Sequence, residues 1–180
     1  MLAALGAAIM EWTGSSVALI EALGHGRRNL SSIDVSNTMG FFLSYSPLLI
    51  AKSDLETRKE CFNRIGEATK IGWTFDVARF HHEDTAIRSK LEAFPRAQVL
   101  FNFVGREIGS LEDTILEVSN DYRGIETDPK GKRDHLLAVL AIIKNERLVV
   151  RFVYSQNFHT DLAIEKLSQL FLVNLEQLSD

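Results

Sequence analysis

Residues 136–154, LLAVLAIIKNERLVVRFVY, decide the fold that we expect for this chain. Leu136–Ile143 is apolar throughout, and Arg147–Tyr154 is a second segment rich in β-branched and aromatic side chains. Between them stand Lys144-Asn145-Glu146, a short polar connection with turn character. Two strand-like segments joined by so short a turn predict an antiparallel β-hairpin.

A helix is predicted soon after this hairpin. Thr160 is a favourable N-cap residue, because its hydroxyl can accept a hydrogen bond from a free backbone N–H of the first turn. The apolar side chains that follow recur at helical spacing and form one stripe: Ile164, Leu167, Phe171, Leu175 and Leu178. We expect this stripe to pack on the sheet.

Upstream of the hairpin the pattern predicts another strand and two helices. The strand is Ala97–Val104, and a short helix over Thr85–Phe94 ends before Pro95. Ser53-Asp54-Leu55-Glu56 has the spacing of a capping box and predicts a helix that begins there. Gly72 stands where a C-cap glycine would end that helix.

The N-terminal third predicts a helix and two strands. Met1–Met10 has apolar residues at helical spacing and no Lys or Arg before Arg27, so we interpret it as a core helix rather than a secretory signal. Because the chain enters a core helix at once, we expect it to be part of a longer protein. Ser16–Leu23 is predicted to be a buried strand, and Pro47 demotes the end of the strand-like Met39–Ile50 to a sheet-edge or irregular position.

Together these elements predict one α/β domain over residues 1–180, a mixed β-sheet with helices packed on it. Leu111–Ser119 is compatible with strand or helix, and Asn120–Asp134 is predicted to be a long loop. The single cysteine, Cys61, excludes an intramolecular disulfide and indicates a reducing compartment, for which we expect the cytoplasm. The net charge of −4 gives no general attraction to nucleic acid or to an anionic membrane.

Two histidine segments are candidates for chemistry. His81-His82-Glu83-Asp84 lacks a ligand spacing that would direct both rings to one ion, so we expect no metal and interpret it as a solvated connection. Gly24-His25-Gly26 is more specific, because the flanking glycines let the backbone bend closely and present an imidazole at a strand end. His25 is therefore a candidate general acid or base, or else a surface turn residue.

Several segments, read in order, resemble motifs in the C-terminal half of the condensation and epimerization domains of nonribosomal peptide synthetases. They are Trp12-Thr13-Gly14, Leu23-Gly24-His25-Gly26-Arg27, Asp34–Phe42 with Pro47, Gly72–Phe75 with Arg79-Phe80, Phe101-Asn102-Phe103-Val104-Gly105, and Tyr154-Ser155 with His159. The resemblance covers nearly the whole chain.

This resemblance implies a chloramphenicol-acetyltransferase-like half domain and an active site in a tunnel between two halves. It implies as partners an N-terminal subdomain that carries the catalytic His-His-x-x-x-Asp-Gly motif and a peptidyl carrier protein with a phosphopantetheine arm. No cofactor would be bound by the chain directly. By motif, His25, Asn102 and Tyr154 are expected near the tunnel.

The departures from the family pattern concern catalysis. Epimerization-type domains have a proton-transferring Glu where this chain has Leu23, which can neither accept nor donate a proton. Glu21 would share the strand face of Leu23 but lie about 7 Å further back. His81-His82 is not followed by the Asp-Gly of the catalytic motif. We therefore expect a catalytically incomplete chain.

An alternative is a self-contained acyltransferase or epimerase that uses His25 and completes its site by oligomerisation. The first interpretation also predicts an apolar seam where the other half would pack, and a homodimer as one way to cover it. The first helix and the Phe41-Phe42 segment are the predicted seam.

Overall fold

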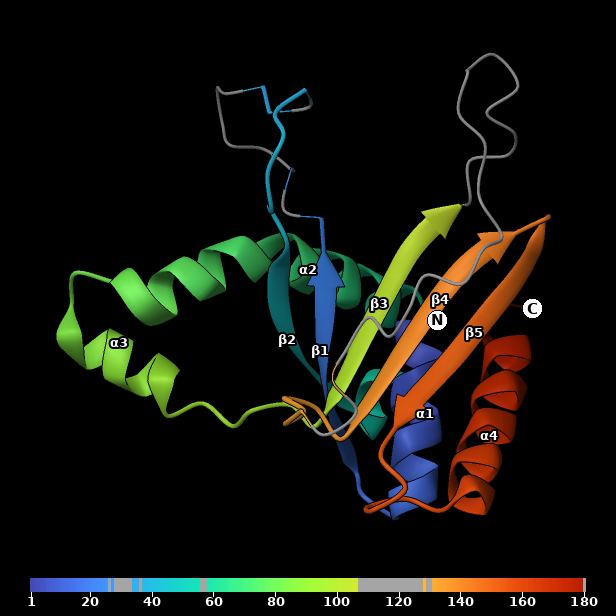
Figure 1. The fold of residues 1–180 in the computed structure, drawn as a ribbon. Helices are drawn as coiled ribbons and strands as arrows, with labels where there is room; N and C mark the ends of the chain where they lie inside the picture. The colour runs from blue at the N-terminus through green and yellow to red at the C-terminus, as the bar shows by residue number, and fades with distance from the viewer. Residues whose placement is uncertain are drawn as a thin grey trace.

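The computed structural model describes residues 1–25, 27, 34–35, 37–55, 58–106, 128 and 131–179, with the backbone alone at 58–60, 68–74, 76 and 179. Within this part of the chain the elements are α1 (Leu2–Thr13), β1 (Val17–Gly24), β2 (Ser44–Ala51), the 3₁₀-helix η1 (Lys52–Leu55), α2 (Arg58–His81), α3 (Thr85–Glu92), β3 (Val99–Arg106), β4 (Leu137–Lys144), β5 (Arg147–Tyr154) and α4 (Asp161–Ser179). The five strands form one sheet in the order β2-β1-β3-β4-β5 (Figure 1).

The sheet is mixed, as the sequence predicts. The three central strands β1, β3 and β4 are parallel, while β2 and β5 pair antiparallel at the two edges. The predicted hairpin is confirmed as β4–β5, in which Lys144 pairs with Arg147. Its two turn residues, Asn145 and Glu146, have φ angles of 48° and 62°. Two left-handed turn residues match the twist that joins antiparallel strands. Pro47 lies in the edge strand β2, where a missing ladder donor is tolerated.

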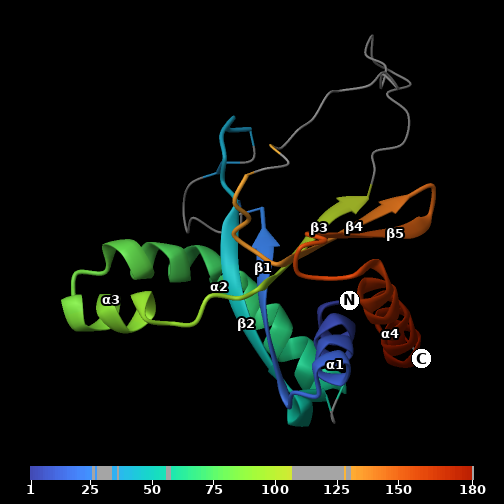
Figure 2. The same cartoon turned by 60° about the horizontal axis from the view of Figure 1, so that its bottom comes forward.

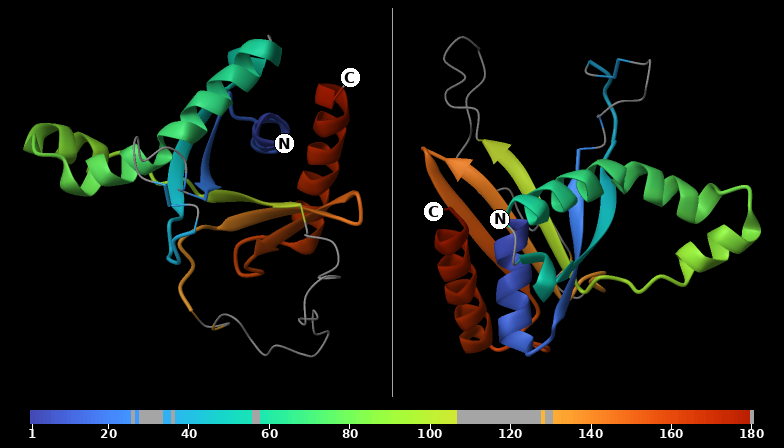
Figure 3. Two further views of the ribbon diagram at one scale, coloured as in Figure 1. Left: turned by 90° about the horizontal axis from the view of Figure 1, so that it is seen from above. Right: turned by 180° about the vertical axis from the view of Figure 1, so that it is seen from behind.

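Helices cover one face of this sheet. Figures 2 and 3 show α1, α2 and α4 on the same side, and the far part of α2 extends with α3 beyond the β2 edge. The opposite face, which we call the open face, carries no helix within the described residues. None of the helices in this part of the chain combines the length and the hydropathy needed to cross a lipid bilayer.

The core lies between the sheet and the helices. Its fully buried large side chains are Phe171, Leu5, Ile20, Ile50, Leu167 and Val139. The N-terminal helix is thus a central part of the core, and its assignment to an exposed apolar seam is wrong. Leu5 and Ile9 face the strands and α4 because an apolar stripe at helical spacing buries most area between two other elements. Phe41, in contrast, is 81% exposed.

The C-terminal helix follows the sequence prediction closely. The Thr160 hydroxyl accepts a hydrogen bond from the backbone N–H of Ala163 at 3.3 Å, which caps α4. Ile164, Leu167 and Phe171 are buried, and the rest of the stripe packs against the same core.

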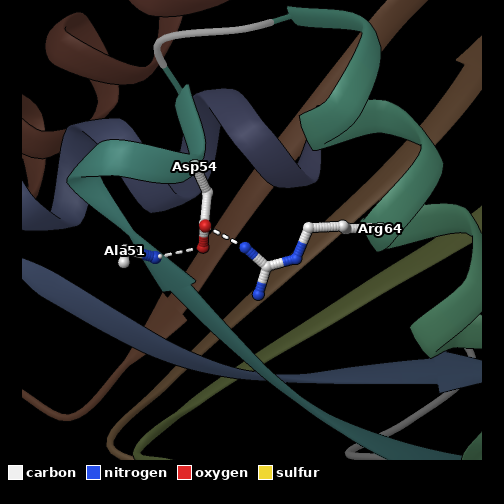
Figure 4. Close-up of polar contacts among 3 residues, drawn as sticks. All are labelled: Ala51, Asp54 and Arg64. Carbon is white, nitrogen blue, oxygen red and sulfur yellow. Dashed lines mark hydrogen bonds and ion pairs between the residues drawn. The ribbon is translucent and has the colours of Figure 1, made fainter.

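Helix α2 differs from its prediction at both ends. The capping-box segment forms η1, and α2 begins only at Arg58. The cause is Asp54, whose carboxylate accepts from the Ala51 N–H at 2.9 Å and pairs with Arg64, so it ties this turn to β2 and α2 (Figure 4). At the other end α2 continues through Gly72, since one glycine costs a helix only about 1 kcal/mol.

The predicted helix before Pro95 is confirmed as α3. Asp84 caps it by accepting from the N–H of Ala86 at 2.8 Å. The predictions for Leu111–Ser119 and for most of Asn120–Asp134 lie outside the described residues.

Candidate functional site

Strand register determines which side chains share the open face. Ala18, Ile20 and Ala22 of β1 are buried under the helices, so Leu19, Glu21 and Leu23 point to the other side. One row across that face therefore consists of Tyr45, Leu23, Asn102, Leu140 and Arg151. The next row consists of Pro47, Glu21, Leu100, Ala138 and Val153. The prediction that Glu21 and Leu23 share a strand face is confirmed.

A histidine–carboxylate pair lies on this face. His135 Nε2 is 2.6 Å from Glu21 Oε2, and the two side chains are only 15% and 20% exposed. His135 belongs to residues 131–136, which run on the open side before entering β4 (Figure 2). Sequence reasoning missed His135 because the contact joins positions 114 residues apart. Its place just before a parallel strand is the signal that could have indicated it.

His25 lies just beyond β1 and is exposed. Its Nδ1 accepts a hydrogen bond from the Arg27 backbone N–H at 3.2 Å. A backbone N–H only donates, so the neutral ring carries its proton on Nε2. With the proton on Nε2, that nitrogen of His25 is a hydrogen-bond donor, and a general base there would require a different tautomer.

The Arg27 side chain organises the loop beside His25. Its Nη1 donates to the carbonyls of Val35 at 2.9 Å and Thr38 at 2.6 Å, and its Nη2 donates to that of Gly40 at 3.2 Å. The guanidinium also stacks on the Phe42 ring, 4.4 Å from the centroid. The planar fork of arginine serves all four contacts at once, which lysine could not do. Arg27 therefore fixes the described part of the segment that resembles the Asp34–Phe42 motif.

The other two predicted site residues lie on different faces. Asn102 is half-buried on the open face, beside Leu23. Tyr154 pairs with Leu137 on the helix-covered side and packs against the core. By strand spacing, His25 and Tyr154 are separated by roughly 16 Å along the strands and roughly 14 Å across them. The structure thus groups His25 with Asn102 and not with Tyr154; that these residues line a tunnel stays a prediction.

Tyr154 has a local partner of its own. Its hydroxyl donates to Asp161 Oδ1 at 2.7 Å, at the start of α4. This hydrogen bond raises the pKa of Tyr154, and the same bond, with a second from Gln156, lowers the pKa of Asp161. The contact ties β5 to α4.

The remaining candidates show no site chemistry. His82 Nδ1 accepts from the Asp84 N–H at 3.0 Å, and among the residues that the structure describes no group of three His, Cys, Asp or Glu side chains could hold a metal. Cys61 is buried, and desolvation, followed by the charge of Asp54, raises the pKa of its thiol. Two surface hollows of about 590 and 570 Å³ lie along α1 and α4, on the covered side.

Known proteins that are similar to this chain include two bacterial synthases. One component of the linear gramicidin synthase of Brevibacillus parabrevis is 28% identical over 184 residues, which is 99% of this chain and 4% of that protein. One component of the plipastatin synthase of Bacillus subtilis (strain 168) is 28% identical over 171 residues, which is 88% of this chain and 6% of that protein. The chain thus spans a small fraction of these relatives.

Solved structures show the same fold. The epimerization domain from the third module of tyrocidine synthetase B superposes with a TM-score of 0.77 at 22% identity, over 98% of this chain and 40% of that one. A condensation domain involved in chain release from the enacyloxin polyketide synthase gives 0.61 at 16% identity, over 98% of this chain and 35% of that one. The family model for the condensation domain matches residues 1–180. The chain therefore belongs to the condensation domain family.

Proposed function

We propose that this chain is the C-terminal half of a condensation- or epimerization-type domain. Its open face forms one wall of a tunnel for substrates carried on phosphopantetheine. The partners are an N-terminal subdomain with the His-His-x-x-x-Asp-Gly motif and a cytoplasmic peptidyl carrier protein, and the chain itself binds no cofactor.

The observation that carries this proposal is the apolar open face. Sheets made only of parallel strands occur almost always with both faces covered. Here β1, β3 and β4 are parallel, yet the described helices cover one side. Leu49 of β2 and Val149 of β5, at opposite edges of the open face, are 56% and 45% exposed, and Leu23, Leu100 and Leu140 of the strands between them are partly exposed. Apolar side chains left exposed on a sheet face are typical of an interface.

Coverage of the solved relatives supports the same conclusion. This chain matches 40% of the tyrocidine epimerization domain chain, so most of that domain chain lies outside the match. An additional subdomain seated on the open face would supply the second layer that the parallel strands require.

The chain is proposed to be catalytically incomplete alone. Leu23 lacks a proton-transferring group, and the tautomer of His25 that accepts from the Arg27 N–H at Nδ1 holds its proton on Nε2. A self-contained enzyme that uses His25 is therefore not favoured.

Association with the missing half tests this function. The N-terminal half of a condensation domain, for example from the linear gramicidin synthase, is produced separately and titrated into this chain while hydrogen exchange is followed. We expect slower exchange in β1 and β3. Leu23→Lys should weaken binding at least about tenfold, since it places a charge in the apolar contact.

The matched control is Leu162→Lys, because Leu162 is 75% exposed on α4, away from the open face. It should bind like the wild type. Light scattering shows whether the chain alone forms a dimer that the added half dissociates. Equal loss of binding in both variants, or protection confined to α4, would contradict the proposed wall.

A further inference from the structure

The Glu21–His135 pair is an ionisable pair among apolar side chains of the open face. Along β1, Glu21 lies between Leu19 and Leu23, and its neighbours in register on β2 and β3 are Pro47 and Leu100. A carboxylate among apolar side chains is stabilised only when it is hydrogen-bonded or paired. His135 supplies one such bond at 2.6 Å.

This bond leaves part of the carboxylate available. A carboxylate accepts, so His135 Nε2 carries the proton that it donates to Oε2. Two carboxylate oxygens have about four acceptor sites. Within the described residues, no further hydrogen bond to the Glu21 carboxylate occurs. The Glu21 side chain is 20% exposed, and the bond from His135 orients its carboxylate.

We propose that Glu21, held by His135, binds the primary ammonium group of an aminoacyl substrate. This inference rests on the proposed function, which brings aminoacyl thioesters along this wall. A charge-assisted bond between an ammonium and a carboxylate is strong in an apolar setting. His135 is a positioning residue, because it fixes the carboxylate and does not touch the ligand.

Asn102 extends the site in the direction of the substrate arm. It lies on the neighbouring strand, two residues beyond Leu100, the register partner of Glu21. Strand geometry separates two such positions by about 8 Å. When the ammonium is bound at Glu21, Asn102 is within reach of the first amide group of the pantetheine arm. The asparagine side chain can donate a hydrogen bond to that amide or accept one from it.

Ligand binding to the chain alone tests the proposal without catalysis. The probe is phenylalanyl-pantetheine amide, in which nitrogen replaces the labile thioester sulfur, and its N-acetyl derivative lacks the ammonium. Affinities are measured by nuclear magnetic resonance titration. The wild type should prefer the free amine, and Glu21→Gln should reduce that preference about tenfold or more, as expected for a hydrogen bond between charged groups. His135→Gln should reduce it less, because the carboxylate remains.

The control variant is Glu92→Gln, which removes an exposed carboxylate at the end of α3 and should leave the preference unchanged. Dispersed spectra of each variant establish that it is folded. Phenylalanine amide without the arm distinguishes a bare ammonium site from one that requires pantetheine.

The outcomes separate the two proposals. If Glu21→Gln keeps the full preference for the amine while both ligands still bind at Asn102, the ammonium site is refuted and the wall is not. If neither ligand binds to the wild type, both are refuted.

Discussion

The two faces of the sheet are built from the same strands but differ in what closes them. On the helix-covered face Ile20 and Val139 are fully buried, and Phe101 is 4% exposed. One residue away in sequence, Glu21 and Asn102 point to the open face and keep contact with solvent. The covered face therefore holds the core, whereas the open face carries polar groups that solvent reaches.

Hydrophobicity alone does not distinguish the faces. In β4 the covered side has Leu137, Val139 and Ala141, and the open side has Ala138, Leu140 and Ile142. Only helix packing separates them, since α1 and α4 pack against the first set. The comparison can therefore be tested by substitutions that are alike in chemistry and differ in face.

The largest difference is expected within β1. Ile20→Ala should destabilise the chain by about 3 kcal/mol, because it leaves a cavity under the helices. Leu23→Ala, on the other side of the same strand, should cost about 1 kcal/mol, because the Leu23 side chain removes less apolar area from water on folding. Chemical denaturation of both variants gives the two values. Similar losses would mean that the open face is packed as tightly as the core.

A second pair of substitutions probes how closely the helices cover the sheet. A Cβ at Gly6 of α1 would lie 2.8 Å from Ile50 Cδ1 and 3.3 Å from Ile50 Cβ. Gly6→Ala should thus destabilise by about 1–2 kcal/mol, even after the gain in helix propensity.

Gly66 of α2 is the matched control, because among the described residues no heavy atom beyond its own helix backbone and chain neighbours lies within 4 Å of its would-be Cβ. Gly66→Ala should stabilise the chain by about 0.5–1 kcal/mol. Thermal unfolding then shows shifts of opposite sign. A shift of the same sign in both would indicate that α1 is not seated on β2 as described.

The sequence predicted the covered face well because that face has a periodic signature. The stripe of α4 has a helical period, and the apolar run Ser16–Leu23 is typical of a buried strand. The α2 boundaries were wrong because Ser53 and Glu56 fit a capping pattern, while the Asp54 contacts with Ala51 and Arg64 decide the local structure.

The site was less predictable because its contacts are long-range. Arg27 donates to backbone carbonyls, and because every residue has one, the sequence does not indicate which of them accept. His135 reaches Glu21 only through the order of the parallel strands. Motif matching grouped Tyr154 with His25 and Asn102. However, β5 runs antiparallel to β4, so Tyr154 at the end of β5 lies beside Leu137 at the start of β4.

The smallest effect is expected at Tyr154, where the covered face joins α4. The Tyr154 hydroxyl lowers the pKa of Asp161, so this bond stabilises the fold above the ordinary aspartate value of about 4 and is lost as the pH falls through the lowered pKa. The same bond raises the pKa of Tyr154, so it stabilises the fold below the ordinary tyrosine value of about 10. That contribution is lost as the pH rises through the raised pKa of Tyr154.

Tyr154→Phe should therefore flatten the dependence of unfolding free energy on pH at both ends, with little change near neutrality beyond the loss of one exposed hydrogen bond. Urea denaturation from about pH 3 to about pH 11 measures this, and Ser168→Ala, which removes a hydroxyl bonded to the Glu165 carbonyl within α4, serves as the control. An unchanged slope on the acid side in Tyr154→Phe would show that Asp161 is held by Gln156 alone. Neither Tyr154 nor Asp161 lies on the open face. Ligand binding at Glu21 should therefore be the same in Tyr154→Phe as in the wild type, so that the effect of this variant is on stability alone.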